Sequence, residues 1–222
     1  MMSLSARIAL LVLALVGCVA CDGQPGDTKS GRTDDRPAFL AYVPAGVHSK
    51  APLVFALSPS GDARSMLKAW QPIADQRGWI VVASKQFRNG IDYEIVFRQL
   101  NDVIDVLTRD YPVDANRIVV MGLSGGAMAG HAFSQVAPAR VRAVIANCGM
   151  MEEAFMRDDY PRGKLVAFVA SPTDFRFGAM QRDRAFLSGK GWTSTWIEFP
   201  GGHTLAPTPA LDRAAAWLEE HW

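Results

Sequence analysis

Short, continuous apolar runs alternate with amphipathic segments along most of this chain. Five of the runs have the length of one strand and lack the polar alternation of a strand with one solvated face: APLVFAL, WIVVAS, RIVVMG, VRAVIAN and KLVAFVAS. Such runs are typical of parallel strands that are buried on both faces of a sheet. Helical periodicity separates them, most clearly over residues 93–111. The pattern therefore predicts an α/β fold with a doubly wound, mostly parallel sheet.

All of these elements lie within residues 37–222, which we expect to form one domain. Further strands are predicted over residues 38–44 and 194–200, and further helices over residues 62–77, 125–136, 179–187 and 209–220. A chain of 222 residues has room for one domain with a substantial core, but not for a large lid as well. Ligands of such sheets bind beyond the carboxyl ends of the strands, so functional residues are expected in the loops that follow the apolar runs.

The N-terminus carries a different pattern. Arg7 is followed by the apolar run IALLVLALVGCVAC, which is too short to span a bilayer comfortably and has the length of a signal-peptide hydrophobic region. The run contains LVGC, residues 15–18, which resembles the lipobox of bacterial lipoproteins. That resemblance implies a signal peptide over residues 1–17, cleavage before Cys18 and lipidation of its thiol. The acyl chains would then anchor the protein in a membrane.

The residues after Cys18 indicate where in the cell the protein is located. Val19 stands where an aspartate would retain a lipoprotein in the inner membrane. We therefore expect a lipid-anchored protein of the bacterial cell envelope, at the outer membrane and facing the periplasm. The alternative is a plain secretory signal with a chance cysteine, which would give a secreted protein. Within residues 18–36, the segment from Asp22 to Arg36 is polar and lacks apolar periodicity, as is typical of a flexible tether.

One serine stands among glycines at a predicted strand-to-helix turn. The stretch GLSGG, Gly122 to Gly126, ends the run RIVVMG and begins a helical segment. A nucleophilic serine on such a sharp turn crowds the residues two positions to either side, and glycine fits there because it lacks a Cβ. The pattern predicts Ser124 as a nucleophile and the N–H of Gly125, at the helix N-terminus, as an oxyanion donor. A turn that merely allows close packing or binds phosphate is the alternative.

A serine hydroxyl needs a base, and the base needs a third group that fixes its tautomer. His203 lies in the Gly-rich loop FPGGHTLAP after the last predicted strand, where the site of such a sheet is expected. The chain order typical of a serine nucleophile on this kind of turn is Ser, acid, His. Asp174 follows closely on the run KLVAFVAS, so we expect it to be the acid, with Asp159 as the alternative.

Composition excludes several classes of protein and site. The formal net charge is +1 and no basic cluster appears, which argues against a nucleic-acid-binding protein. Three cysteines are too few for a disulfide scaffold, and no Cys/His cluster has metal-ligand spacing. We therefore expect no metal and no other cofactor. Cys148, at the end of a predicted strand, is expected to be a buried free thiol.

The chain at this point resembles the α/β-hydrolase superfamily, and within it the group of secreted esterases that includes feruloyl esterases and polyhydroxybutyrate depolymerase-like proteins. The resemblance covers most of residues 37–222. Its most specific part is the block YPVDANRIVVMGLSGGAM, and PLVFAL, VRAVIANCG, ASPTD and GGH also carry it. It implies an α/β-hydrolase fold without a large lid, with Ser124 as nucleophile, His203 as base and Asp174 as the orienting acid.

One loop departs from the pattern of this group. Its members usually have His-Gly after the strand that corresponds to PLVFAL, and the next loop residue donates the second oxyanion N–H. Here the sequence is SPSGDA, residues 58–63, and Pro59 has no N–H to donate. Ser60 or Gly61 could replace it, and Ser60 is the expected donor. Losing one such donor costs about 10²–10³-fold in turnover, so this loop bears on the level of activity.

These features together predict a serine hydrolase that cleaves a small-molecule carboxylic ester through an acyl-enzyme, using Ser124, His203 and Asp174. A serine peptidase or polyester depolymerase is the alternative within enzymes. A lipoprotein that keeps the fold but acts as a binding or scaffold protein is the alternative from another class, and the missing His-Gly is its best support.

Overall fold

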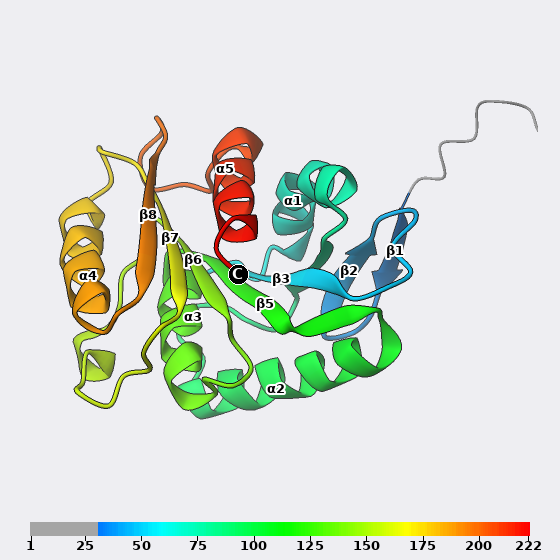
Figure 1. Ribbon diagram of the computed structural model, residues 1–222, viewed down its shortest axis with the longest axis horizontal. Helices are drawn as coiled ribbons and strands as arrows, with labels where there is room; N and C mark the ends of the chain where they lie inside the picture. Colours follow the sequence, from blue (N-terminus) through cyan, green and yellow to red (C-terminus); the bar gives the residue numbers. More distant parts are fainter. Residues whose placement is uncertain (1–30) are drawn as a thin grey trace, which may run out of the picture.

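An eight-stranded sheet runs through the computed structural model, which describes residues 31–222 (Figure 1). Its strands are β1 (Arg32–Asp35), β2 (Phe39–Val43), β3 (Ala51–Leu57), β4 (Ile80–Ser84), β5 (Val113–Leu123), β6 (Ala143–Asn147), β7 (Leu165–Ala170) and β8 (Thr193–Glu198). They lie in the order β1-β2-β4-β3-β5-β6-β7-β8. β2 pairs antiparallel with β1 and with β4, whereas the other neighbouring pairs are parallel. The mostly parallel sheet predicted from the apolar runs is confirmed.

Helices cover both faces of this sheet. One face is covered by α1 (Ala63–Arg77) and α5 (Thr208–Glu219) (Figure 1). The other face is covered by α2 (Tyr93–Asp110), α3 (Gly125–Val136) and α4 (Phe177–Gly189). Glu153–Phe155 forms a single 3-10 turn, η1. Alternate side chains of the central strands enter two separate apolar cores, one with α1 and α5 and one with α2, α3 and α4. This is the predicted doubly wound arrangement, and it explains why these strands read as unbroken apolar runs.

The first two helices begin and end where the sequence supplies capping groups. Asp62 caps α1 by accepting a hydrogen bond of 3.0 Å from the N–H of Ser65. Asp92 caps α2 in the same way, at 2.7 Å from the N–H of Glu94. At the other end of α1, Gly78 adopts a φ of 69°, and its N–H bonds to the carbonyl of Ala74 at 2.8 Å. These caps satisfy backbone groups that the helix itself leaves unpaired.

The boundary of the domain lies earlier than residue 37. Residues 32–35, expected in the flexible tether, form β1 and pair with β2, so this part of the expectation is wrong. The Tyr111 hydroxyl donates a hydrogen bond to Asp34, which holds the segment against the domain. As an edge strand β1 exposes most of its side chains, and it therefore needs no apolar pattern that a sequence would reveal.

The predicted signal peptide over residues 1–17, the lipidated Cys18 and the earlier part of the tether lie outside the described residues. They stay predictions from the sequence. Among residues 31–222, none of the helices combines the length and the hydropathy needed to cross a bilayer.

Candidate active site

Ser124 occupies a strained turn between β5 and α3. β5 ends at Leu123 and α3 begins at Gly125, and Ser124 between them has a φ of 54° and a ψ of −115°. A residue with a Cβ rarely adopts such a conformation, and neighbouring bonds must hold it there. The Ser124 N–H donates to the carbonyl of Asn147 at 2.9 Å, and its own carbonyl accepts from the N–H groups of Ala127 and Met128. The turn presents the serine side chain above the carboxyl end of β5.

Two glycines flank this turn because no side chain would fit. A Cβ on Gly122 would overlap the backbone of Gly126 and Ala127. A Cβ on Gly126 would overlap the carbonyl of Leu57, at the end of β3. The close approach of strand, turn and helix therefore requires glycine at both positions. This is the physical reason for the GLSGG pattern.

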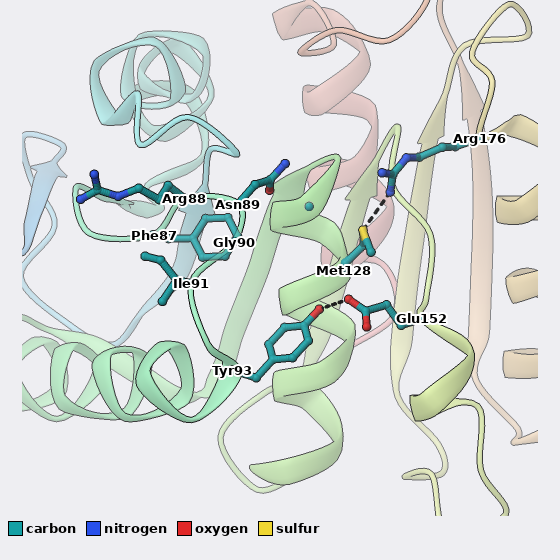
Figure 2. Close-up of a pocket in the computed structure, with 10 residues that line it drawn as sticks. Phe87, Arg88, Asn89, Gly90, Ile91, Tyr93, Met128, Glu152 and Arg176 are labelled. Carbon is teal, nitrogen blue, oxygen red and sulfur yellow. Dashed lines mark hydrogen bonds between the residues drawn. The ribbon is translucent and has the colours of Figure 1, made fainter.

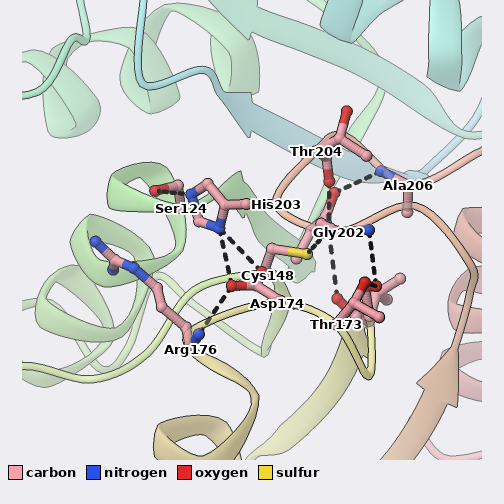
Figure 3. A network of polar contacts seen from close by, with 12 residues as sticks. Ser124, Cys148, Thr173, Asp174, Arg176, Gly202, His203, Thr204 and Ala206 are labelled. Carbon is pink, nitrogen blue, oxygen red and sulfur yellow. Dashed lines mark hydrogen bonds and ion pairs between the residues drawn. The ribbon is translucent and has the colours of Figure 1, made fainter.

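The structure brings the three sequence-predicted residues Ser124, His203 and Asp174 into one chain of hydrogen bonds (Figure 3). His203 Nε2 lies 2.9 Å from Ser124 Oγ. On the other side of the ring, His203 Nδ1 lies 2.9 Å from Asp174 Oδ2 and 3.1 Å from Oδ1. Asp174 follows β7 and His203 follows β8, so three strand ends contribute one residue each. An imidazole placed in this way can accept the serine proton while the carboxylate holds its orientation.

The structure places the alternative acid and the other histidines elsewhere. Asp159 is exposed, and its Oδ1 lies 3.5 Å from Nε of Arg157. His131 is buried inside α3, His48 is exposed, and His221 contacts the carbonyl of Trp217 near the C-terminus. Asp174 and His203 are thus the acid and the histidine that meet Ser124. Among the described residues, no group of three or more His, Cys, Asp or Glu is arranged to hold a metal ion.

Asp174 is charged although it is buried. Burial alone would raise the pKa of its carboxyl group, but hydrogen bonds from the Cys148 thiol, the Arg176 N–H and His203 outweigh burial and lower the pKa. The Arg176 N–H lies 2.8 Å from Asp174 Oδ1. For Cys148 the effect is opposite, because burial and the adjacent carboxylate raise the pKa of the thiol to about 12. The pair therefore consists of a carboxylate and a protonated thiol beside it, and the thiol donates to the carbonyl of Gly202 at 3.5 Å.

Two side chains that the sequence did not single out hold the His203 loop in place. Asn147, fully buried at the end of β6, accepts a hydrogen bond of 2.8 Å from the N–H of Ala206 and donates to the carbonyl of Thr204 at 3.3 Å. Ser171 Oγ accepts a hydrogen bond of 2.9 Å from the N–H of Gly202. Asn147 ends an apolar strand and Ser171 follows one. A polar residue at the carboxyl end of an apolar strand is therefore the sequence signal that could have identified both.

The two expected oxyanion donors lie after neighbouring strands, β3 and β5. Gly125 is the first residue of α3, and its N–H belongs to the first turn, where a helix offers no internal acceptor. In the loop after β3, the Gly61 N–H bonds to the carbonyl of Ser58 at 3.1 Å. The Ser60 N–H has only a long contact of 3.4 Å with Ser58 Oγ. Of the two loop residues considered, Ser60 is therefore the one whose N–H is more readily available to a ligand.

Solved structures with a similar fold carry the names of serine hydrolases and esterases. The fluorophosphonate-binding serine hydrolase FphF of Staphylococcus aureus matches with 12% identity and a TM-score of 0.65, over 85% of this chain and 98% of its own. A Bacillus cereus carboxylesterase matches with 19% identity and a TM-score of 0.64, over 78% and 89%. Esterase PE8 matches with 19% identity and a TM-score of 0.66, over 87% and 99%.

These likenesses show that this chain has the α/β-hydrolase fold, which confirms the expectation drawn from the sequence. No protein-family model and no curated relative matches the chain significantly.

Proposed function

We propose that this protein is a serine hydrolase that cleaves small carboxylic esters through an acyl-enzyme. The observation that carries the proposal is the unbroken contact from Ser124 Oγ through both ring nitrogens of His203 to the Asp174 carboxylate. The names of the structural neighbours support hydrolysis as the class of reaction.

In the first half of the reaction, Ser124 Oγ attacks the ester carbonyl while His203 Nε2 takes the serine proton. Asp174, ionised in its hydrogen-bonded setting, stabilises the imidazolium that forms. The N–H groups of Gly125 and Ser60 donate to the oxyanion of the tetrahedral intermediate. The C–O bond to the alcohol then breaks, and the imidazolium gives its proton to the leaving oxygen. Ser124 is left as an acyl ester.

In the second half, water attacks the acyl carbon and His203 takes its proton. Collapse of this intermediate releases the carboxylic acid and returns the proton to Ser124 Oγ. The cavity beside α3 has a volume of about 300 Å³, the lower end of the range for small-molecule sites. That volume suits a small acyl or alcohol group on the substrate.

The test is steady-state hydrolysis of p-nitrophenyl acetate by the purified protein. Ser124→Ala and His203→Ala should each lower kcat by about 10⁴-fold, since the nucleophile and its base act as one unit. Ser188→Ala, at a serine of α4 away from the site, is the matched control and should keep the wild-type rate. Turnover that survives Ser124→Ala would refute the proposal, and a wild type inactive on every ester would favour the binding or scaffold protein.

A further inference from the structure

A cavity borders the N-terminus of α3, and Arg176 is the cationic side chain that reaches across to this helix (Figure 2). Residues 87–91, Gly125 and Met128 line the cavity together with Arg176. Gly125 directly follows Ser124 in the chain. Ser124 and His203 do not themselves line the cavity, so a group held there lies beside the proposed nucleophile and not on it.

The Arg176 guanidinium has no carboxylate partner among the described residues. Its Nη1 lies 2.8 Å from the thioether sulfur of Met128, which is a weak acceptor. Its Nε is buried and has no hydrogen-bond partner within residues 31–222. By contrast, Arg77 contacts an aspartate at 2.7 Å, and Arg117 contacts another at 2.8 Å. The Arg176 Cζ also lies 5.4 Å from the centre of the Phe175 ring, which supplies no such acceptor. Leaving the buried Nε–H without an acceptor is costly, so the position suits a ligand that supplies one.

The remaining charges of the cavity direct an anion toward Arg176. Two other charged side chains line the cavity, Arg88 and Glu152. Arg88 is exposed, and Figure 2 shows its guanidinium pointing away from Met128 and Arg176. The Glu152 carboxylate accepts a hydrogen bond from the Tyr93 hydroxyl. Figure 2 shows this pair and Arg176 on different sides of Met128. A carboxylate bound near Glu152 would be repelled, whereas one bound at Arg176 meets a planar donor fork that matches its geometry.

We propose that Arg176 binds a carboxylate carried by the substrate, so that the enzyme prefers small esters with an anionic group over neutral esters of the same shape. This inference rests on the proposed esterase function and specifies its substrate class. The anionic group can stand on the acyl or on the alcohol half of the ester, and the experiment separates the two.

Substitution of Arg176 leaves the support of Asp174 in place. Asp174 receives its hydrogen bond from the backbone N–H of Arg176, which any residue other than proline retains. A change in selectivity on substitution therefore reports the side chain and not the alignment of His203.

The experiment compares kcat/KM for two pairs of isosteric substrates. Mono-p-nitrophenyl adipate and its primary amide place the charge on the acyl half, and 4-acetoxybenzoate and 4-acetoxybenzamide place it on the alcohol half. In at least one of the two pairs, the wild type should hydrolyse the carboxylate with a higher kcat/KM than the amide. Arg176→Gln should lower that carboxylate-to-amide ratio about 10–100-fold, because a charged hydrogen bond is lost. Arg176→Lys should keep part of the preference, since it retains the charge without the fork.

Arg184→Gln is the matched control, because it removes an arginine of α4 that lies over Trp196 and outside this cavity. Its carboxylate-to-amide ratio should equal that of the wild type. A wild type that hydrolyses the esters without preferring a carboxylate in either pair would overturn the inference and leave the esterase proposal intact. An unchanged ratio in Arg176→Gln would likewise overturn the inference alone. A wild type inactive on all four esters would overturn the inference, and one inactive on p-nitrophenyl acetate as well would overturn both.

Discussion

Ser124 and Cys148 both adopt a positive φ although neither is glycine, at 54° and 45°. Each follows the carboxyl end of a central strand, and each is held by a backbone hydrogen bond to the next strand. The Ser124 N–H bonds to the carbonyl of Asn147 and the Cys148 N–H to that of Val169, at 2.9 Å and 3.0 Å. Such conformations cost about 1–3 kcal/mol each, so the surrounding sheet must impose them. The strain places the hydroxyl and the thiol on the same edge of the sheet.

The Cys148 thiol should be chemically inert in the folded protein. Its pKa rises from 9.0 to about 12, and the side chain is fully buried. At pH 8 its thiolate fraction is lower by about 10³-fold than at the ordinary pKa, and only the thiolate is alkylated. Iodoacetamide followed by peptide mapping should therefore modify Cys148 at least about 10³-fold more slowly in the native protein than in urea. Equal rates in both conditions would show that the thiol is not buried beside the Asp174 carboxylate.

At the scale of elements, the loop after β8 depends on the end of β6 for its position. Asn147 connects the two through its bonds with Thr204 and Ala206, which stand on either side of Leu205 just after His203. The amide of Asn147 also donates to the carbonyl of Val169 on β7. A single buried side chain thus joins three elements, and the imidazole is aligned with Ser124 as a consequence.

Asn147→Ala should therefore reduce both stability and turnover. The buried Ala206 N–H would lose its acceptor, which we expect to lower the free energy of unfolding by about 1–3 kcal/mol. Misalignment of His203 should lower kcat by about 10²-fold. Urea denaturation and ester hydrolysis measure the two effects, with Asn116→Ala at an exposed asparagine as the control. Wild-type kcat in Asn147→Ala would show that the loop holds its position without this side chain.

The strands and helices of the interior were predictable because their burial leaves a periodic signal. The expected helix over residues 125–136 coincides with α3, and the unbroken run KLVAFVAS contains β7. β1 was missed because an exposed edge strand carries no such signal. The meeting of Ser124, Asp174 and His203 was predictable from strand ends, since parallel strands place their carboxyl ends on one edge. Arg176 was not, because only the fold shows that no carboxylate among the described residues neutralises it.

At the scale of the whole molecule, one buried histidine links stability to pH. His131 lies fully buried in α3, and neither of its ring nitrogens has a hydrogen-bond partner among the described residues. Burial lowers its pKa from 6.5 to about 3. At a pH between these two pKa values, His131 binds a proton in the unfolded chain but not in the folded protein. The free energy of unfolding therefore falls as the pH decreases.

His131 should accordingly make the protein sensitive to mild acid. Below pH 6.5 it should contribute a loss of about 1.4 kcal/mol in unfolding free energy per pH unit, continuing toward the folded-state pKa. His131→Leu should flatten the pH dependence of urea denaturation between pH 6.5 and pH 4, and His48→Leu controls for the loss of an exposed imidazole. A slope in His131→Leu as steep as in the wild type would contradict this account.

The central claim, that Ser124 is a nucleophile activated by His203, is tested most directly by covalent labelling. A fluorophosphonate probe should form one adduct per chain, and peptide mapping by mass spectrometry should place it on Ser124. His203→Ala should label far more slowly, and Ser124→Ala should not label. A wild-type protein that stays unmodified, or one that carries the adduct on another residue, would contradict the account.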